Sequence, residues 1–455
     1  MPTAWSLEPT ANRWLMTLAQ LWHRAFLERR PSLSVGLFRI AVAWTVAAHM
    51  IPSFFHMDEN YLSTAFQTKN FNFFPISMLR LVEASPNWMV WAFVAIFCVS
   101  LTTFAFGLWA QLSCVIMTLA CYYFYALNNL HIGTLSFDIL LVTLFLMCVT
   151  DYHSDFLSLD SLRRGKVRSY KRLRPVFLQR LLQLQLAWTF WYTALSKITA
   201  GGNWLTDNPY YYLMRYPPGG VVRNFPLRAW LGQHPSLCFE LGVVLLAFEF
   251  LIPFLWFIPR TRPVGIGLGI AFQLMLWGTL QVPTIFLFLF PPMMLLFIRP
   301  ETLVQWIEAR QARHAERGRG VLLYDGQCGF CLASVRRVRV LDIFGWVDPL
   351  DFHTQPDLSA IHPSLTWERC HSEMVLLEPN GRLSGGFEAF ARLSRRLPLL
   401  WPVAPFTYVP GAHWLGAQGY RWIAEHRYLL HRNPACATNQ CTLPYRSPQS
   451  GASNN

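Results

Sequence analysis

Long apolar stretches separated by short polar segments fill the chain between residues 33 and 299. Each stretch is close to the ~20 residues that a helix needs to cross the hydrocarbon core of a bilayer. The pattern predicts about eight membrane-spanning helices, at 33–51, 88–107, 109–127, 134–150, 176–198, 237–258, 264–281 and 283–299. Because the last two meet at Val282-Pro283, they form either a hairpin or one broken helix.

The pattern changes after residue 299. Residues 300–319 are rich in arginine and predict an amphipathic helix that leaves the membrane and lies along anionic headgroups. Shorter apolar runs then predict strands at 321–324, 346–352, 374–377 and 383–384, and helices at 328–343, 387–397 and 414–430. The last two strands flank Pro379-Asn380-Gly381, which is a hairpin signal. We therefore expect a mainly α polytopic membrane bundle over 1–299, a linker over 300–319, a small α/β domain over 320–432 and a disordered tail over 433–455.

Composition favours lipid over nucleic acid as the partner of the first domain. Hydrophobic residues make up 53% of the chain and charged residues 14%, against roughly 25% charged in a soluble domain. The net charge of +13 would suit nucleic acid, but the arginines lie mainly beside apolar spans, which membrane topology explains. Lysines and arginines are densest before span one, at 163–174 and at 260–262. The positive-inside rule then places both termini in the cytoplasm, as in a multi-pass protein of a bacterial inner membrane.

Two cysteines at C-x-x-C spacing carry the clearest chemistry. The predicted strand at 321–324 runs into the glycine turn at Gly326, and Cys328 and Cys331 follow where a helix begins. A helix N-terminus favours a thiolate, and a reactive thiolate must also be accessible. We assign Cys328 as the nucleophile and Cys331 as the resolving cysteine. The alternative is a zinc site completed by the pair Cys436 and Cys441, although the strand–turn–helix order favours redox chemistry and no resident metal.

Ionisable residues inside the predicted spans are the second candidate site: Arg39, His49, Asp138, Lys197 and Glu249. A charge at mid-membrane costs at least ~2.5 kcal/mol, so each needs a partner or a function. One explanation is internal pairing, of Arg39 or Lys197 with Asp138 or Glu249. Lys197 either extends to the outer headgroups or, desolvated among aromatic residues, acts as a base. The cysteines in or beside the spans are expected to act as small hydrophobic residues: Cys98, Cys114, Cys121, Cys148 and Cys238.

The dithiol segment is similar to a known family. Tyr324-Asp-Gly-Gln-Cys-Gly-Phe-Cys331 resembles the D-G-x-C-x-x-C signature of the DCC family of thiol-disulfide oxidoreductases. The later segments 374–383, 386–390 and His426-Arg427 follow that family's layout, so the resemblance covers roughly 320–432.

This resemblance implies a thioredoxin-like fold whose signature residues are Asp325, Gly326, Cys328 and Cys331. It also shows a departure, because thioredoxins place a proline before the strand that begins here at Met374. His371-Ser-Glu373 stands there instead, so we expect the docking of substrates to differ.

The membrane domain resembles a second family. The segment from Leu184 to Lys197 and on to Trp204, Arg39 in Leu37-Phe-Arg-Ile, and Asn128-Asn129 before His131 are similar to the HTTM family over about 30–298. This family includes the vitamin K-dependent γ-glutamyl carboxylase. The resemblance implies that Lys197 is the base that deprotonates a hydroquinone and that His131 is a functional histidine. The carboxylase, however, has an extensive lumenal domain, whereas the longest outer loop here is about 199–236.

Three hypotheses follow. The first is a membrane-bound thiol-disulfide oxidoreductase of the protein-disulfide reductase type, acting on a disulfide-bearing protein or a small thiol compound. Its bundle would hold a quinone or another lipid-soluble partner. The second is a vitamin K-dependent carboxylase-like enzyme whose dithiol domain recycles the cofactor. The third is a non-enzymatic scaffold or transporter with a redox-sensor domain.

Overall fold

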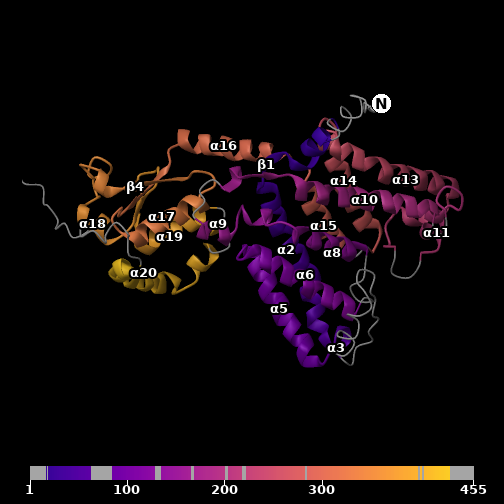
Figure 1. The fold of residues 1–455 in the computed structure, drawn as a ribbon, viewed down its shortest axis with the longest axis horizontal. Helices are drawn as coiled ribbons and strands as arrows, with labels where there is room; N and C mark the ends of the chain where they lie inside the picture. Colours follow the sequence, from indigo (N-terminus) through magenta and orange to yellow (C-terminus); the bar gives the residue numbers. More distant parts are fainter. Residues whose placement is uncertain are drawn as a thin grey trace, which may run out of the picture. The chain divides into compact units, whose positions relative to one another are not determined.

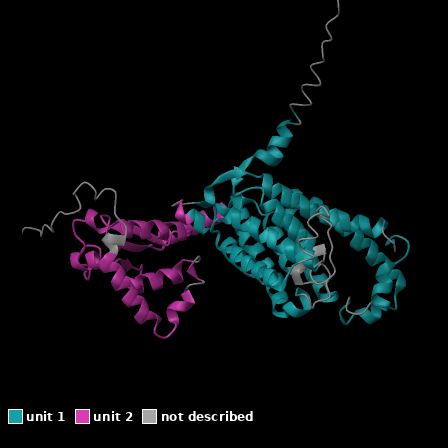
Figure 2. Cartoon of the chain, turned by 60° about the horizontal axis from the view of Figure 1, so that its bottom comes forward, with its two compact units in different colours: residues 1–161, 169–303 teal, residues 162–168, 304–455 magenta. Residues whose placement is uncertain are grey.

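The computed structural model describes residue 17 and residues 19–62, 85–128, 135–164, 169–199, 203–217, 222–281, 284–397, 400–401 and 404–430. Side chains are described in these ranges except at 135–136, 284–287 and 427–430. The chain divides into two compact units (Figure 2). The membrane unit comprises residues 1–161 and 169–303, and the C-terminal unit comprises residues 162–168 and 304–455.

The membrane unit is built of helices (Figure 1). A helix lies in each segment predicted to span the membrane: α2 (Leu33–Ser53), α5 (Asn87–Phe106), α6 (Ala110–Leu127), α8 (Leu135–Met147), α10 (Phe177–Thr199), α13 (Pro235–Phe257), α14 (Arg262–Thr279) and α15 (Thr284–Leu295). Short elements connect them: η1 (His23–Leu27), η2 (Phe54–His56), α3 (Met57–Asn60), η4 (Tyr152–Ser154), α9 (Leu159–Arg163), η5 (Ser169–Lys171), α11 (Pro209–Arg215) and α12 (Arg228–Leu231). Strands β1 (Arg29–Pro31) and β2 (Leu173–Pro175) pair antiparallel.

Four helical segments in the described part of the chain are long and apolar enough to cross a membrane. They are Leu33–Asn60, Asn87–Phe106, Ala110–Leu127 and Pro235–Phe257. Helices α8 and α15 are shorter, with 13 and 12 residues. Helix α10 has 23 residues but carries arginine, lysine and three glutamines, which lower its hydropathy. The total of about eight spans therefore stays a prediction.

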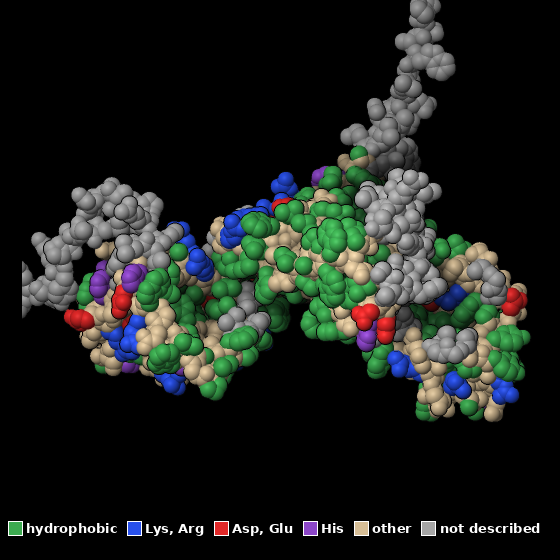
Figure 3. All heavy atoms as spheres, turned by 90° about the horizontal axis from the view of Figure 1, so that it is seen from below, with side chains coloured by type: hydrophobic (Ala, Val, Ile, Leu, Met, Phe, Trp, Pro, Cys, Tyr) green, Lys and Arg blue, Asp and Glu red, His purple; other side chains and the backbone are tan. Residues whose placement is uncertain are grey.

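The outer surface of the membrane unit is apolar. Figure 3 shows hydrophobic side chains over much of the visible face of this unit. Large side chains on its helices are more than half exposed: Trp44, Trp88, Val99, Leu112, Trp188 and Val244. Contiguous apolar surface of this kind indicates contact with lipid or with another protein.

Aromatic residues fill the interior of the membrane unit. Helix α2 packs against α5 and α15, α10 packs against α8 and α13, and α5 and α6 pack against each other. Phe38, Phe97, Phe124 and Trp256 are buried in the shared core. The short helix α9 also anchors α6, because both carboxylate oxygens of Asp160 accept hydrogen bonds at 3.0 Å from backbone N–H groups at the start of α6. These N–H groups have no partner within the helix.

The C-terminal unit contains a four-stranded sheet in the order β4-β3-β5-β6. Its strands are β3 (Gly320–Tyr324), β4 (Val347–Asp351), β5 (Val375–Leu377) and β6 (Leu383–Gly385). β4 is parallel to β3, whereas β5 is antiparallel to both β3 and β6. The helices are α16 (Pro300–Glu316), which begins in the membrane unit, α17 (Gly329–Leu341), η6 (Phe352–Thr354), α18 (Trp367–Ser372), α19 (Gly386–Arg396), η8 (Ala404–Tyr408) and α20 (Ala412–Leu430).

Both faces of this sheet are buried, because successive strand residues point to opposite sides. Leu322 and Leu376 pack on one face with residues of α17 and α19. Leu323 and Val375 pack on the other face with residues from 352 to 370. The predicted hairpin is confirmed, since Gly381, with φ of +81°, donates its N–H to the Glu378 carbonyl at 2.9 Å. The sequence pattern did not predict α18.

Candidate functional site

The two cysteines of the C-x-x-C motif lie where β3 passes into α17, as the sequence predicts. Strand β3 ends at Tyr324 and α17 begins at Gly329, so Cys328 is the N-cap residue of the helix. Its Sγ accepts a hydrogen bond from the backbone N–H of Cys331 at 3.3 Å. An N–H donor at the positive end of a helix stabilises negative charge on the sulfur. The local geometry thus favours Cys328 as the thiolate.

A buried carboxylate precedes the cysteines. Asp325 is 1% exposed, and its Oδ1 accepts the N–H of Gln327 at 2.9 Å. The same oxygen lies 3.0 Å from Nε2 of His353, which lies in η6 just after the neighbouring parallel strand β4. His353 stacks on Phe352 and meets Trp367 edge-on. The contact between Asp325 and His353 therefore ties the turn before Cys328 to the end of β4.

Position 326 needs a glycine because a second carboxylate, that of Asp351, lies directly beside it. A Cβ at this position would lie 1.9 Å from Oδ2 of Asp351, so no larger residue fits without a local shift. Oδ1 of Asp351 accepts the N–H groups of both Gly326 and His353 at 3.1 Å. Asp325, just after β3, and Asp351, the last residue of the adjacent parallel strand β4, thus fix the turn that carries Cys328.

Both sulfur-bearing residues are buried, which differs from the accessible thiol that the sequence analysis expects. Cys328 is 0% exposed and Cys331 is 3% exposed. Since disulfide exchange needs direct contact between sulfur atoms, a substrate reaches them only after neighbouring residues move.

Sequence reasoning missed His353 and Asp351. A usable signal was present, because Asp351 lies near the end of the predicted strand at 346–352 and His353 directly follows it. Functional side chains commonly gather at the carboxyl ends of parallel strands. What the sequence does not show is that this strand lies beside the one that leads into Cys328.

Cys370 is a buried cysteine of the same unit in a different setting. It lies in α18, is 2% exposed, and burial raises the pKa of its thiol to about 11. Cys436 and Cys441, which the zinc alternative needs, lie outside the described residues. Among the residues that the structure describes, no group of three or more histidine, cysteine or acidic residues could hold a metal.

In the membrane unit, Lys197 and Glu249 form an ion pair between α10 and α13. Nζ and Oε2 are 2.5 Å apart, and the two side chains are 21% and 8% exposed. The ammonium also lies 5.5 Å from the centre of the Trp204 ring. The predicted internal pairing is confirmed for these two residues.

Arg39 has different partners from those predicted. It is completely buried, and its guanidinium donates to the backbone carbonyls of Leu157 at 2.5 Å and His153 at 3.3 Å. A Cβ at Gly107, where φ is +67°, would lie 2.0 Å from Nη1 of Arg39. The predicted pairing of Arg39 with Asp138 or Glu249 is therefore wrong, because the loop after α8 supplies the acceptors.

The other candidate residues of the membrane unit are not partners of Lys197, Glu249 or Arg39 in the described part of the structure. Asp138 lies near Tyr125, and the His49 ring lies 5.1 Å from the ring of Phe137. His131 lies outside the described residues, so its assignment stays a prediction.

Two cysteines of the membrane unit come close together, although the sequence analysis treats them as separate small hydrophobic residues. Sγ of Cys148 lies 3.7 Å from Sγ of Cys114 and 3.4 Å from the hydroxyl of Thr118. Cys114 lies in the second turn of α6, and Cys148 directly follows α8. Neither is at the N-cap of a helix, which distinguishes this pair from Cys328 and Cys331.

Comparison with known proteins finds two family models that match the chain. The HTTM domain matches residues 28–302, which is more than half of the chain. The DCC1-like thiol-disulfide oxidoreductase matches residues 322–433. No curated protein and no solved structure matches the chain.

Proposed function

The chain belongs to the HTTM domain family and carries a DCC1-like thiol-disulfide oxidoreductase domain, and from this premise we propose that it is a membrane-bound thiol-disulfide oxidoreductase. Its reacting groups are Cys328 and Cys331. The observation that carries the proposal is the hydrogen bond from the Cys331 N–H to Cys328 Sγ at the first turn of α17. Such a donor stabilises the thiolate that disulfide exchange requires.

The topology of the C-terminal unit supports a thioredoxin-like fold. β3, α17 and β4 form a βαβ unit with parallel strands, and β5 and β6 extend the sheet as an antiparallel hairpin. A C-x-x-C motif at the first strand–helix junction of a βαβ unit is typical of thioredoxin-like redox proteins.

The reaction proceeds in two exchanges. The Cys328 thiolate attacks one sulfur of a substrate disulfide, which breaks that bond, forms a mixed disulfide and releases a substrate thiolate that takes up a proton. Cys331 then loses its proton and attacks Cys328 Sγ, which forms the Cys328–Cys331 disulfide and releases the second substrate thiol. Two electrons pass from the protein to the substrate, and a cytoplasmic thiol must return them.

Asp325 and His353 act in this scheme as positioning residues. Asp325 Oδ1 holds the N–H of Gln327 at 2.9 Å, one residue before the nucleophile, and lies 3.0 Å from His353 Nε2. A turn held by these contacts keeps Cys328 at the N-cap position, where the thiolate is stabilised.

We place the dithiol and both termini in the cytoplasm, on the reducing side of a bacterial inner membrane. The support is the excess of lysine and arginine before the first span, at 163–174 and at 260–262, since such residues favour cytoplasmic loops. A reducing compartment keeps the dithiol reduced, so the reaction runs toward reduction of substrate disulfides.

The bundle offers an apolar pocket for a lipid-soluble partner. It has an empty volume of about 280 Å³, part of which is open to the outside, and is lined by apolar side chains and Thr189. The Thr189 hydroxyl donates to the Gln185 carbonyl at 2.9 Å. Among the described lining residues, no other side chain could donate a hydrogen bond to a quinone oxygen. The pocket thus suits an isoprenoid or acyl chain better than a quinone ring, and no electron-transfer step is routed through it.

The carboxylase-like alternative gains no support from Lys197. A base must be able to accept a proton, and a lysine 2.5 Å from a carboxylate is typical of an ammonium ion pair. The sensor alternative differs from our proposal in one respect, namely that its dithiol does not turn over.

The decisive experiment traps the mixed disulfide. In Cys331→Ser the second exchange is blocked, so substrates stay attached to Cys328 and mass spectrometry of intact membranes identifies them. Under our proposal, Cys331→Ser accumulates adducts, and the purified full chain catalyses repeated reduction of a disulfide substrate.

The control is Cys328→Ser/Cys331→Ser, which should trap nothing, whereas Cys370→Ser/Cys331→Ser should trap as much as Cys331→Ser. Adducts on Cys331 in Cys328→Ser alone would reverse the assigned roles. Adducts without turnover would favour the sensor alternative, and stoichiometric zinc in the purified chain would contradict the redox assignment.

A further inference from the structure

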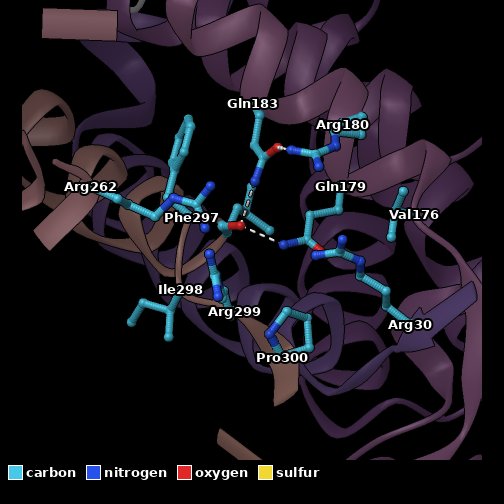
Figure 4. Close-up of a pocket in the computed structure, with 11 residues that line it drawn as sticks. Arg30, Val176, Gln179, Arg180, Gln183, Arg262, Phe297, Ile298, Arg299 and Pro300 are labelled. Atoms are coloured by element: carbon cyan, nitrogen blue, oxygen red, sulfur yellow. Dashed lines mark hydrogen bonds between the residues drawn. The ribbon is translucent and has the colours of Figure 1, made fainter. Parts of the chain in front are cut away.

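Four arginines line one pocket of the membrane unit: Arg30, Arg180, Arg262 and Arg299. They come from β1, from the first turn of α10, from the first residue of α14 and from the residue before α16. Figure 4 shows Arg262 on the left of the pocket and Arg30 and Arg180 on the right, with Arg299 below. The pocket has an empty volume of about 300 Å³, part of which is open to the outside.

The carboxylates near this pocket do not balance its charge. Glu28 lies 2.8 Å and Glu301 lies 3.8 Å from Arg30. Arg180 and Arg262, in contrast, donate hydrogen bonds to neutral acceptors at 2.8–3.1 Å. Two carboxylates thus face four guanidinium groups, which leaves an excess of positive charge. Because like charges in a partly buried site repel each other, an anion in the pocket would lower the energy of this arrangement.

Two glutamines hold a backbone carbonyl that lines the pocket. Gln179 and Gln183 donate their side-chain amides to the carbonyl of Leu296 at 2.5 and 2.7 Å, and the dashed lines of Figure 4 converge on this oxygen. This carbonyl lies just past the end of α15, where backbone oxygens lack helical partners. Because both amides donate to this carbonyl, its oxygen does not repel an anion in the pocket.

The pocket lies where membrane helices end. α10 and α14 begin at its edge, and α13 and α15 end nearby. Phe297 and Ile298 supply apolar surface beside the arginines. A ligand that combines a negative group with an apolar tail matches this combination, and guanidinium groups bind phosphate oxygens through paired hydrogen bonds.

We propose that this basic pocket binds a phosphate group, and that an anionic phospholipid headgroup supplies it. The site is separate from the dithiol, and the proposal does not depend on redox activity. Basic pockets between helices at the cytoplasmic side of membranes suit such headgroups.

The test uses the full chain in nanodiscs of phosphatidylcholine, with or without phosphatidylglycerol. Retained lipid is measured by native mass spectrometry and stability by thermal unfolding. Arg299→Gln is the informative variant, because Arg299 is exposed. Losing one charge-assisted contact should lower retention of phosphatidylglycerol about tenfold and abolish most of the thermal shift that this lipid causes.

The matched control is Arg260→Gln, which removes an equal charge from an exposed position on the α13–α14 turn outside the pocket. It should behave like the unchanged chain. Equal lipid retention by the two variants would overturn the proposal. Should Arg299→Gln fold poorly, Arg299→Lys, which keeps the charge but not the paired donors, should show an intermediate loss, and unchanged retention there would also overturn it.

A third arm adds inorganic phosphate in phosphatidylcholine alone. Under our proposal it gives no thermal shift at millimolar concentrations. A shift that Arg299→Gln removes would confirm the phosphate chemistry but overturn the lipid as its source.

Discussion

Buried polar residues are arranged differently in the two units of this protein. In the C-terminal unit, Asp325, Asp351 and His353 share hydrogen bonds around the single turn that carries Cys328. In the membrane unit, the charges of Lys197 and Arg39 have separate partners. Lys197 pairs with Glu249, and Arg39 donates to loop carbonyls.

The cysteines of the two units also differ in the groups that surround their sulfur atoms. Cys328 Sγ receives an N–H donor at the start of α17. Cys114 and Cys148 have their sulfur atoms 3.7 Å apart, but neither is the N-cap of a helix. The two pairs thus differ in their local setting, because Cys328 lies at a helix N-terminus, which favours a thiolate, whereas Cys148 does not.

The largest expected effect on disulfide reduction comes from removing the nucleophile. Cys328→Ser should lower the rate of disulfide reduction by about a thousandfold or more, because a serine hydroxyl does not replace a thiolate. Cys148→Ser should leave the rate within about twofold, since this sulfur lacks a helix N-terminus. Both rates are measured on the full chain in nanodiscs with a chromogenic disulfide. A comparable loss in Cys148→Ser would remove the contrast between the two units.

The next largest effect is on stability and concerns the ion pair of Lys197 and Glu249 in the membrane unit. Glu249→Leu leaves the Lys197 ammonium without its carboxylate and should destabilise the membrane unit by about 3 kcal/mol. Lys197→Met/Glu249→Leu should recover most of this loss, because no charge is left unpaired. Unfolding in mixed detergent micelles measures the stability, and disulfide reduction by the remaining folded protein should be unchanged. Loss of reduction in the stable double variant would mean that the pair takes part in the chemistry.

A smaller effect tests the turn before the nucleophile. Gly326→Ala places a methyl carbon 1.9 Å from Asp351 Oδ2, and such overpacking costs about 1–3 kcal/mol. Hydrogen exchange of residues 320–353 should become faster, and disulfide reduction slower. Gly320→Ala is the control, because a Cβ there meets its nearest atom at 3.4 Å. Equal effects of the two substitutions would argue against a fixed turn.

The smallest expected effect belongs to Cys370. Its thiol has a pKa raised to about 11 by burial, so little thiolate is present at neutral pH. Alkylation by iodoacetamide should rise about tenfold per pH unit below that value and level off above it. Cys370→Ser should change disulfide reduction by less than about twofold. Rapid alkylation of Cys370 at pH 7, followed by mass spectrometry, would show that burial in this unit does not suppress thiol reactivity.

Local patterns in the sequence predicted the elements well, because their causes are local. The apolar run before Gly326 predicted β3, and Pro379-Asn380-Gly381 predicted the β5–β6 turn. Contacts across long separations were not predictable in this way. His353 meets Asp325 because β4 lies beside β3, and Arg39 meets the loop after α8 because the bundle closes around it. Burial of Cys328 likewise depends on the packed domain and not on the motif.

A redox titration of the full chain tests the central claim most directly. The protein is equilibrated with dithiothreitol buffers of increasing oxidised fraction, thiols are blocked, and peptides are mapped by mass spectrometry. Our account predicts one two-electron transition in which Cys328 and Cys331 become linked to each other while Cys370 stays a thiol. If Cys328 and Cys331 remain thiols across the titration, or link to other cysteines, the account is contradicted.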